Sequence, residues 1–183
     1  MNKSSAGILM HARSLLVDHL FALLISLVLT NIIHFFNPTG IPVLQLIISA
    51  SVYFSITYSD SWHRGVSDGN KIRAGVLKKN WLRGFYAGLI ASIPGFALAL
   101  FACCAEIGIC NVYDVFGVDI FTSINRFWQL PFSALYLLAN ENPLLNLLFP
   151  FFLPVFSEIG YIMGMKGYTL KKYFLYKNID GNR

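Results

Sequence analysis

YSDSWHRGVSDGNKIRAGVLKKNWLR, residues 58–83, is the long polar segment in the middle of this chain. On one side lies IPVLQLIISASVYFSITYS, residues 41–59, and on the other GFYAGLIASIPGFALALFACCAEIGI, residues 84–109. Each apolar flank is close to or above the roughly 20 residues that a helix needs to cross a bilayer core. The polar segment therefore predicts a cytoplasmic loop, residues 59–83, between two membrane-spanning helices.

The composition excludes an ordinary water-soluble domain. Of the 183 residues, 56% are hydrophobic and 13% are charged, whereas soluble domains commonly contain about a quarter of charged residues. The formal net charge of +5 does not indicate nucleic-acid binding, because the basic residues alternate with segments too apolar for a solvated surface. We therefore expect an all-α integral membrane protein that forms one membrane domain over residues 1–183.

The apolar segments predict a four-transmembrane-helix bundle, with spans at about residues 14–36, 41–58, 84–109 and 143–165. The turn at residues 37–40 is so short that the first two spans are expected to be antiparallel neighbours. Pro150 and Pro154 predict a bend or partial unwinding in the outer half of the last span. No small-residue cleavage site follows the first apolar run, so we interpret that run as an uncleaved span and not as a signal peptide.

The outer segment, residues 110–142, is expected to hold an additional helix. Residues 120–138 are apolar enough to resemble a fifth span, but polar residues and a proline interrupt them, namely Asn125, Arg126, Gln129 and Pro131. An interfacial helix or a re-entrant segment fits this pattern better than a crossing.

The lysines and arginines predict the orientation. Of the 14, two precede the first span, six lie in residues 59–83 and five lie in the tail, residues 166–183. Four crossings bring these groups to one side, which is the cytoplasm by the positive-inside rule. We therefore expect both termini on the cytoplasmic side of a plasma membrane, where the basic residues lie near anionic lipid head groups.

Glycines spaced four apart predict where the helices pack. Gly84 and Gly88 begin the third span, and Gly160 and Gly164 end the fourth. Small residues let helix backbones approach closely, which is a main source of helix association in lipid. We expect the third and fourth spans to cross at these glycines. The alternative is that they are the glycines frequent in any membrane helix.

Three ionisable residues with a predicted role lie inside the spans: Asp18, His19 and Glu158. Such residues cost roughly 2.5–3.5 kcal/mol on insertion scales and are functional candidates. His19 and Glu158 are expected at comparable depths on their spans. We predict a polar cluster in which Glu158 meets His19 or the Asp18-His19 pair, either as a structural clamp or as a proton or cation relay.

A group of potential ligands near the outer face does not predict a metal site or a cofactor. These residues are His34, Cys103, Cys104, Glu106 and Cys110. Their spacing matches no recognised ligand pattern, and membrane cysteines commonly serve as small packing residues.

The polar segment carries its own pattern of residues: Trp62, Arg64, Gly65, Asp68, Asn70 and Lys71. Glycine, aspartate and asparagine at such spacing predict a defined turn, which would dock a cytoplasmic partner or a lipid phosphate. The alternative is a solvated basic loop, in which each lysine near anionic lipid contributes about 1 kcal/mol.

Three stretches resemble a group of small, uncharacterised multipass membrane proteins of Gram-positive bacteria. They are SWHRGVSDGNKI at residues 61–72, RGFYAGLIASIP at residues 83–94 and GYIMGMKGYTL at residues 160–170. The resemblance implies a bacterial plasma membrane and four spans, and it brings no activity with it. Where that group tends to have an arginine just before the aspartate, this chain has Ser67, so an ion pair at that position is not implied.

The sequence contains no nucleotide-binding, serine-hydrolase or zinc-protease motif, so an enzyme is disfavoured. A lipid-modifying enzyme would need Asp60, His63 and Asp68 to converge. We predict a non-enzymatic interaction or accessory component whose partner is a membrane protein or a second copy of the chain. The alternative is a small transporter or channel subunit built around Glu158 and a broken fourth span.

Overall fold

The computed structural model describes residues 3–36, 42–107, 120–138 and 143–168, and the secondary structure within these ranges is entirely helical. Four helices are long and apolar enough to cross a membrane, over Ala6–Phe36, Pro42–Arg73, Arg83–Ala105 and Leu144–Lys166. The all-α class and four candidate spans are therefore confirmed. Insertion into a bilayer stays a prediction.

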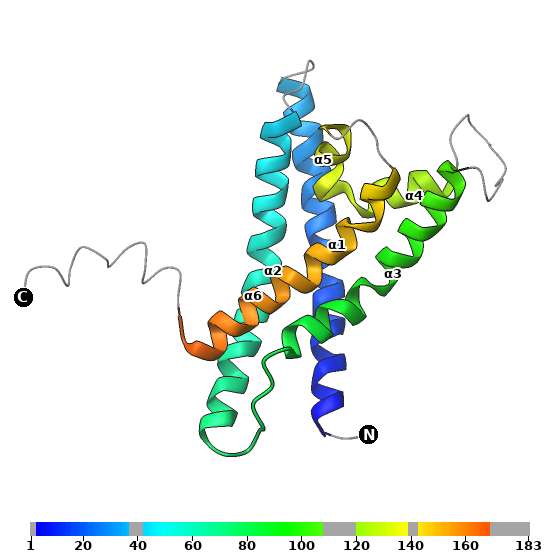
Figure 1. Cartoon of the computed structure of the whole chain (residues 1–183). Coiled ribbons are helices and arrows are strands. Elements are labelled where there is room, and N and C mark those ends of the chain that lie inside the picture. Colours follow the sequence, from blue (N-terminus) through cyan, green and yellow to red (C-terminus); the bar gives the residue numbers. More distant parts are fainter. Residues whose placement is uncertain (1–2, 37–41, 108–119, 139–142, 169–183) are drawn as a thin grey trace, which may run out of the picture.

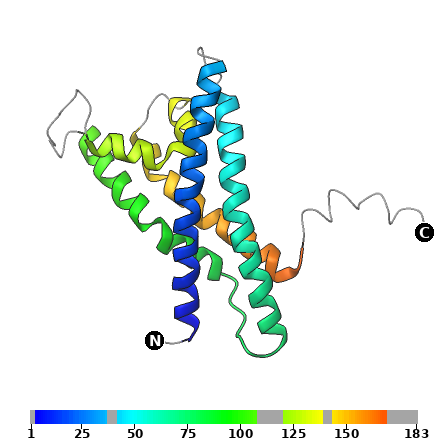
Figure 2. The ribbon, with the colours of Figure 1, turned by 180° about the vertical axis from the view of Figure 1, so that it is seen from behind.

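Two long helices form a hairpin. Helix α1 spans Lys3–Phe36 and helix α2 spans Pro42–Arg73. They lie side by side and antiparallel (Figures 1 and 2). At about 1.5 Å per residue, the 34 residues of α1 make a helix of roughly 50 Å, longer than the ~30 Å core of a bilayer. Helix α1 therefore extends at its N-terminal end beyond the predicted first span, residues 14–36.

The other two long helices cross this hairpin obliquely. Helix α3 spans Arg83–Glu106, with Pro94 in its interior, and helix α6 spans Phe152–Lys166. Figure 1 shows α6 passing between α2 and α3, and α6 contacts both of them. The most extensive contact between two helices is that of α2 with α6.

Helix α6 is preceded by two turns of 3-10 helix, η2 at Pro143–Leu147 and η3 at Phe149–Phe151. Pro150 lies in the first turn of η3, where the backbone N–H that proline lacks would have no helical partner. The first part of the predicted fourth span is therefore 3-10 helix and not α-helix, which is an irregular start but a tighter winding and not the partial unwinding that Pro150 and Pro154 suggested.

Residues 120–138 form a broken helical segment. Helix α4 spans Ile120–Trp128, η1 spans Leu130–Phe132 and helix α5 spans Ser133–Leu138. Pro131 lies at the break. Proline has no backbone N–H to donate, so it cannot make the hydrogen bond that would continue the α-helix. The segment packs at the end of the bundle away from the N terminus (Figure 1). Its interfacial or re-entrant position relative to a membrane stays a prediction.

The predicted loop at residues 59–83 is wrong over most of its length. Helix α2 continues to Arg73, and only residues 74–82 connect it to α3. Gly65 and Gly69 are four residues apart and both are buried against α6. A Cβ added at Gly69 would lie 2.9 Å from the Met165 carbonyl oxygen. Gly65, which belonged to the predicted turn pattern, therefore lies with Gly69 on a helix-packing face.

Helix α2 ends at a glycine with a left-handed backbone. Gly75 has a φ of +72°, and its N–H donates to the Ile72 carbonyl at 3.0 Å. The next N–H, of Val76, donates to the Lys71 carbonyl at 2.9 Å. This pair of bonds satisfies the last carbonyls of a helix and is typical of a glycine-terminated helix.

The glycine pairs divide between two helix contacts. Gly84 and Gly88 lie against α6, and a Cβ added at Gly88 would be 2.5 Å from the Pro154 Cα. Gly160 and Gly164 lie against α2 instead, and a Cβ added at Gly160 would be 2.7 Å from the Tyr58 carbonyl oxygen. The expected crossing of the third and fourth spans is therefore made by the glycines of α3 alone. Helix α6 uses its own glycines to approach a different neighbour.

Candidate functional site

A buried ion pair joins α2 to the start of α3. Arg83 and Asp68 are each 8% exposed, and the Arg83 Nη1 lies 3.1 Å from the Asp68 Oδ2. Tyr161 of α6 donates its hydroxyl to the same oxygen at 3.3 Å. The guanidinium also packs against Gly7 of α1, where an added Cβ would overlap it. One carboxylate and one guanidinium therefore bring all four long helices together.

A second polar group lies between α1 and α2. The His11 Nε2 lies 3.3 Å from the Ser61 Oγ and 3.6 Å from the Asp60 Oδ2. Ser14 donates its hydroxyl to the Asp60 Oδ1 at 3.1 Å. His11 and Ser61 are almost fully buried. These contacts fix the register of the two hairpin helices.

Two serines continue this group across α6 to α3. Ser61 donates its hydroxyl to the Ser157 Oγ at 3.1 Å, and Ser157 donates to the Gly84 carbonyl at 3.0 Å. Both serines are 0% exposed. Together with the ion pair, these bonds form one set of buried and partly buried polar contacts, which we call the clamp: His11, Ser14, Asp60, Ser61, Asp68, Arg83, Ser157 and Tyr161.

Glu158 is bound to the first turn of α3. Its Oε2 accepts the backbone N–H of Phe85 at 2.6 Å. The residue that precedes α3, Leu82, provides no side-chain cap. The first N–H groups of a helix lack partners within it and carry partial positive charge. The carboxylate from α6 therefore acts as the cap that the sequence of α3 does not provide.

The structure does not bring Glu158 to the Asp18-His19 pair. His19 faces Tyr53 of α2, with 3.1 Å between its Nδ1 and the Tyr53 hydroxyl, and its ring lies 4.8 Å from that of Trp128. Asp18 is half-buried, and its Oδ2 has no hydrogen-bond partner among the described residues. The predicted cluster is wrong because similar depth on two helices does not place side chains on facing sides.

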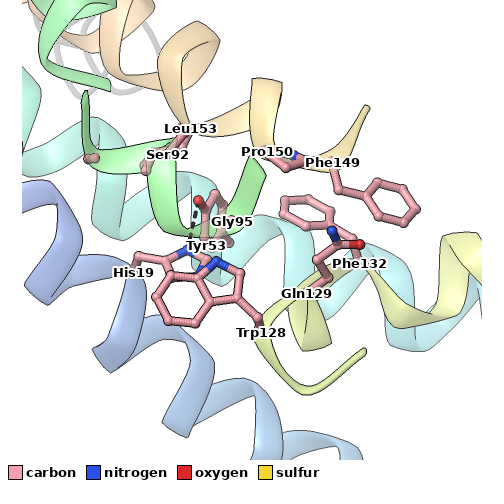
Figure 3. Close-up of a pocket in the computed structure, with 11 residues that line it drawn as sticks. His19, Tyr53, Ser92, Gly95, Trp128, Gln129, Phe132, Phe149, Pro150 and Leu153 are labelled. Atoms are coloured by element: carbon pink, nitrogen blue, oxygen red, sulfur yellow. Dashed lines mark hydrogen bonds between the residues drawn. The ribbon is translucent and has the colours of Figure 1, made fainter. Parts of the chain in front are cut away.

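His19, Tyr53 and Trp128 line a small cavity of about 20 Å³. Figure 3 shows the indole of Trp128 beside the His19 ring, with Tyr53 on the other side. Gly95 of α3 leaves room for the indole, since an added Cβ would be 2.9 Å from its Nε1. The cavity has about the volume that one water molecule needs.

The six residues of the predicted loop pattern lie on helix α2, which places their side chains on different faces and in different surroundings. Gly65 and Asp68 are buried in contacts with α6 and α3, and Trp62 donates its Nε1–H to the Tyr168 carbonyl at 2.7 Å. Lys71 lies 3.5 Å from Asp68 with most of its side chain exposed.

Arg64 is half-buried and Asn70 is exposed. His63 is also exposed, away from the buried contacts of Asp68, so it does not converge with Asp60 and Asp68 as a lipid-modifying site would require.

Two of the cysteines, Cys103 and Cys104, lie in the described part of α3. Cys103 is buried in α3 and Cys104 is half-buried. Within the described ranges, no group of three histidine, cysteine or acidic side chains is placed to hold a metal ion. Cys110 lies outside the described residues.

The sequence interpretation missed His11, Arg83, Ser157 and Tyr161. Arg83 was counted with the loop charges, and His11 lies before the predicted first span and was not considered. One signal was present, because Ser157, Gly160, Tyr161 and Gly164 recur at helical spacing and so share a face. This face contacts Ser61 and Asp68 because α2 continues past residue 58 to Arg73, and the sequence pattern did not predict that continuation.

An aromatic and basic cluster lies on the surface near the clamp. The Lys79 Nζ lies 3.9 Å from the centre of the Trp81 ring, and the Lys166 Nζ lies 5.7 Å from it. All three residues are exposed. We call this group the Trp81 cluster. It joins the connection between α2 and α3 to the end of α6.

No family model, curated protein or solved structure matches this chain.

Proposed function

We propose that this chain is a non-enzymatic interaction or accessory component of a bacterial plasma membrane, with both termini in the cytoplasm. In this proposal the clamp holds four membrane-spanning helices in one arrangement. The Trp81 cluster then faces anionic lipid head groups and a partner at the cytoplasmic side. The partner is another membrane protein or a second copy of this chain.

The observation that carries the proposal is the position of Glu158. A carboxylate inside a membrane span is a functional candidate, but here its Oε2 accepts the N–H of Phe85 and caps α3. The buried charges of Asp68 and Arg83 are likewise paired with each other. These groups are used to fix helices, which supports a structural role better than a chemical one.

The surface supports an interaction role. Tryptophan prefers the membrane–water interface, and lysines near anionic lipid contribute about 1 kcal/mol each. Lys79 and Lys166 both lie over the Trp81 ring. Because Lys166 belongs to α6, its contact gives the cluster a defined shape that residues 74–82 alone would not impose.

Reversing the cluster charge tests the proposal in native membranes. The full chain and a Lys79→Glu, Lys166→Glu double variant are extracted in a mild detergent, and the size of the protein complex is measured on a native gel. Arg13→Glu, at an exposed position of α1, is the matched control. We expect a complex larger than one chain that is lost in the double variant and kept in the control. A wild-type chain that runs alone contradicts the proposal.

A transporter or channel subunit is the second candidate. Two observations favour it. The helix is broken into turns of 3-10 helix before α6, and the buried Asp18 Oδ2 and Glu158 Oε1 have no hydrogen-bond partner among the described residues. Broken helices and intramembrane carboxylates are features of transporters. Proton and sodium flux into proteoliposomes tests this role. Flux that Glu158→Gln abolishes would replace the first proposal.

A further inference from the structure

Helix α2 carries a row of polar side chains on the face that meets α1. The row repeats every fourth residue, so its members follow one another at steps of about 6 Å along the helix axis. Four of its five members are at most 1% exposed, and the fifth, Gln45, is half-buried. The row is about 24 Å long, which is most of the ~30 Å core of a bilayer. We call this row the seam: Gln45, Ser49, Tyr53, Thr57 and Ser61.

Alternate members of the seam contact polar side chains of α1. The two remaining members, Ser49 and Thr57, each lie one helical turn from a contacting residue on either side. Polar contacts therefore follow the hairpin from the first turn of α2 to the clamp. The contacting pairs are Gln45 with Thr30 at 3.1 Å, Tyr53 with His19 at 3.1 Å and Ser61 with His11 at 3.3 Å.

The Ser49 and Thr57 hydroxyls are buried without a hydrogen-bond partner among the described residues. A serine or threonine inside a helix can bond the carbonyl four residues earlier, as Ser92 of α3 does to Gly88 at 2.8 Å. Ser49 and Thr57 make no such bond, although an unbonded buried hydroxyl is costly. Ser26 of α1, which is 0% exposed, is in the same state. These hydroxyls therefore have hydrogen bonds to offer to a small polar molecule.

Water fits the spacing of the seam. One water molecule that bonds two hydroxyls joins oxygens about 5.6 Å apart, since each O–H···O bond is about 2.8 Å long. That distance is close to the step of about 6 Å along the row. The cavity of about 20 Å³ beside His19 and Tyr53 has the volume for one such water, and Figure 3 shows both side chains at it. The His19 Nε2 also lacks a hydrogen-bond partner among the described residues.

We propose that the seam conducts protons along α2 through a file of water molecules that join its hydroxyls. Each hydroxyl or water accepts a proton from the neighbour on one side and donates its own to the neighbour on the other. One proton therefore crosses for each passage, and only O–H and N–H bonds are formed and broken. The electrochemical gradient across the membrane supplies the driving force. Polar and ionisable groups inside membrane spans commonly mark such proton pathways.

Both ends of the seam reach groups that are less buried. At the clamp, Ser61 contacts His11, which lies 3.6 Å from an Asp60 side chain that is 24% exposed. At the other end, half-buried Gln45 lies in the first turn of α2. Glu158 is not a member of the seam. The inference rests on the proposed insertion into a membrane, but not on the proposed partner.

The test measures proton entry into proteoliposomes that hold the full chain. A potassium gradient with valinomycin makes the vesicle interior negative, and the dye pyranine reports the internal pH. Thr57→Val removes one hydroxyl of the seam while keeping the shape of the side chain, and Thr57→Ser keeps a hydroxyl. Ser55→Ala removes an exposed hydroxyl of α2 and is the matched control.

We expect proton entry well above that of protein-free vesicles, and the same entry when choline replaces sodium outside. Thr57→Val should slow entry about tenfold, because the file loses a hydrogen-bond partner at that step, whereas Thr57→Ser and Ser55→Ala should keep it. Entry no faster than that of protein-free vesicles overturns the proposal, as does full entry in Thr57→Val. Equal loss in Thr57→Val and Thr57→Ser would show that packing matters and not the hydroxyl, and it also overturns the proposal.

Glu158→Gln separates this inference from the transporter candidate above. The seam predicts unchanged proton entry in this variant, and entry that the variant abolishes contradicts the seam. The size of the complex on the native gel is a separate measurement. A wild-type chain that runs alone there contradicts the proposed partner, while the proton measurement still decides the seam.

Discussion

Glu158 of α6 accepts the backbone N–H of Phe85 at 2.6 Å, so a side chain from the last helix completes the first turn of another. A Cβ added at Gly84 would lie 3.0 Å from the same carboxylate oxygen. The absence of a side chain at Gly84 therefore lets the Glu158 carboxylate come close enough to accept the Phe85 N–H. The cap and the packing face depend on each other at this point of the bundle.

Glu158→Ala should destabilise the protein by about 1–2 kcal/mol, the typical contribution of a helix cap or a charged hydrogen bond. Glu158→Gln keeps an acceptor oxygen and should lose less than half of that amount. Thermal unfolding in detergent, followed by circular dichroism, measures both. Equal losses in the two variants would show that the charge matters and not the cap.

Breaking the buried ion pair should be far more costly than breaking an exposed one. Asp68→Asn leaves Arg83 buried without its partner, which costs about 3–5 kcal/mol. Lys71→Gln removes a mostly exposed partner of the same carboxylate and should cost under about 1 kcal/mol. A double-mutant cycle with Arg83→Gln, read from unfolding midpoints, gives the coupling. Additive effects of Asp68→Asn and Arg83→Gln would argue against a direct pair.

Gly88→Leu and Gly160→Leu should each destabilise the bundle, but through different contacts. Gly88 faces Pro154 on α6, and Gly160 faces Tyr58 on α2. Overpacking commonly costs about 1–3 kcal/mol, and backbone atoms at these distances cannot move aside as a flexible side chain does. Ile90→Leu, on an exposed part of α3, is the control and should change the melting temperature little.

Pairs of engineered cysteines separate the two contacts. A pair at Gly88 and Pro154 should cross-link α3 to α6, and a pair at Gly160 and Tyr58 should cross-link α2 to α6. If cysteines at Gly88 and Gly160 cross-linked to each other and these two pairs did not, the crossing of the third and fourth spans at both glycine pairs, as the sequence predicted, would be correct.

Reporter fusions test the orientation. Fusions at residue 75 and after residue 183 should both stay in the cytoplasm, and a fusion at residue 40 should be exported. The reason is that lysines and arginines of cytoplasmic segments resist translocation. Export at either of the first two positions would contradict four crossings with cytoplasmic termini.

Composition and hydropathy were enough to predict the helical class and four candidate spans, because a span needs a long apolar run and few charges. They were not enough to place the end of α2. Gly65, Asp68 and Gly69 have low helix propensity and favour turns in an isolated segment. Contact with α6 outweighs that preference, and a contact between residues so far apart is not visible in local spacing.

The candidate site was predictable only in part. Glu158 was identified as important because a carboxylate in a span requires a partner, but the sequence supplied no angle around the helix. Its partner is a backbone N–H, which carries no signature in the residue type of Phe85. His11 and Arg83 were overlooked because each lies close to the end of an apolar run, where charges usually meet solvent.

The position of α6 has a consequence for the order of assembly. Its glycines fit α2 on one side, and α3 places its own glycines on the other, so the last of the four long helices to leave the ribosome lies between two that were made earlier. Before residues 143–168 are synthesised, α2 and α3 lack the helix against which both of them pack. The carboxylate that caps α3 is also missing at that stage. A chain stopped before residue 143 should therefore be a substrate for membrane quality-control proteases.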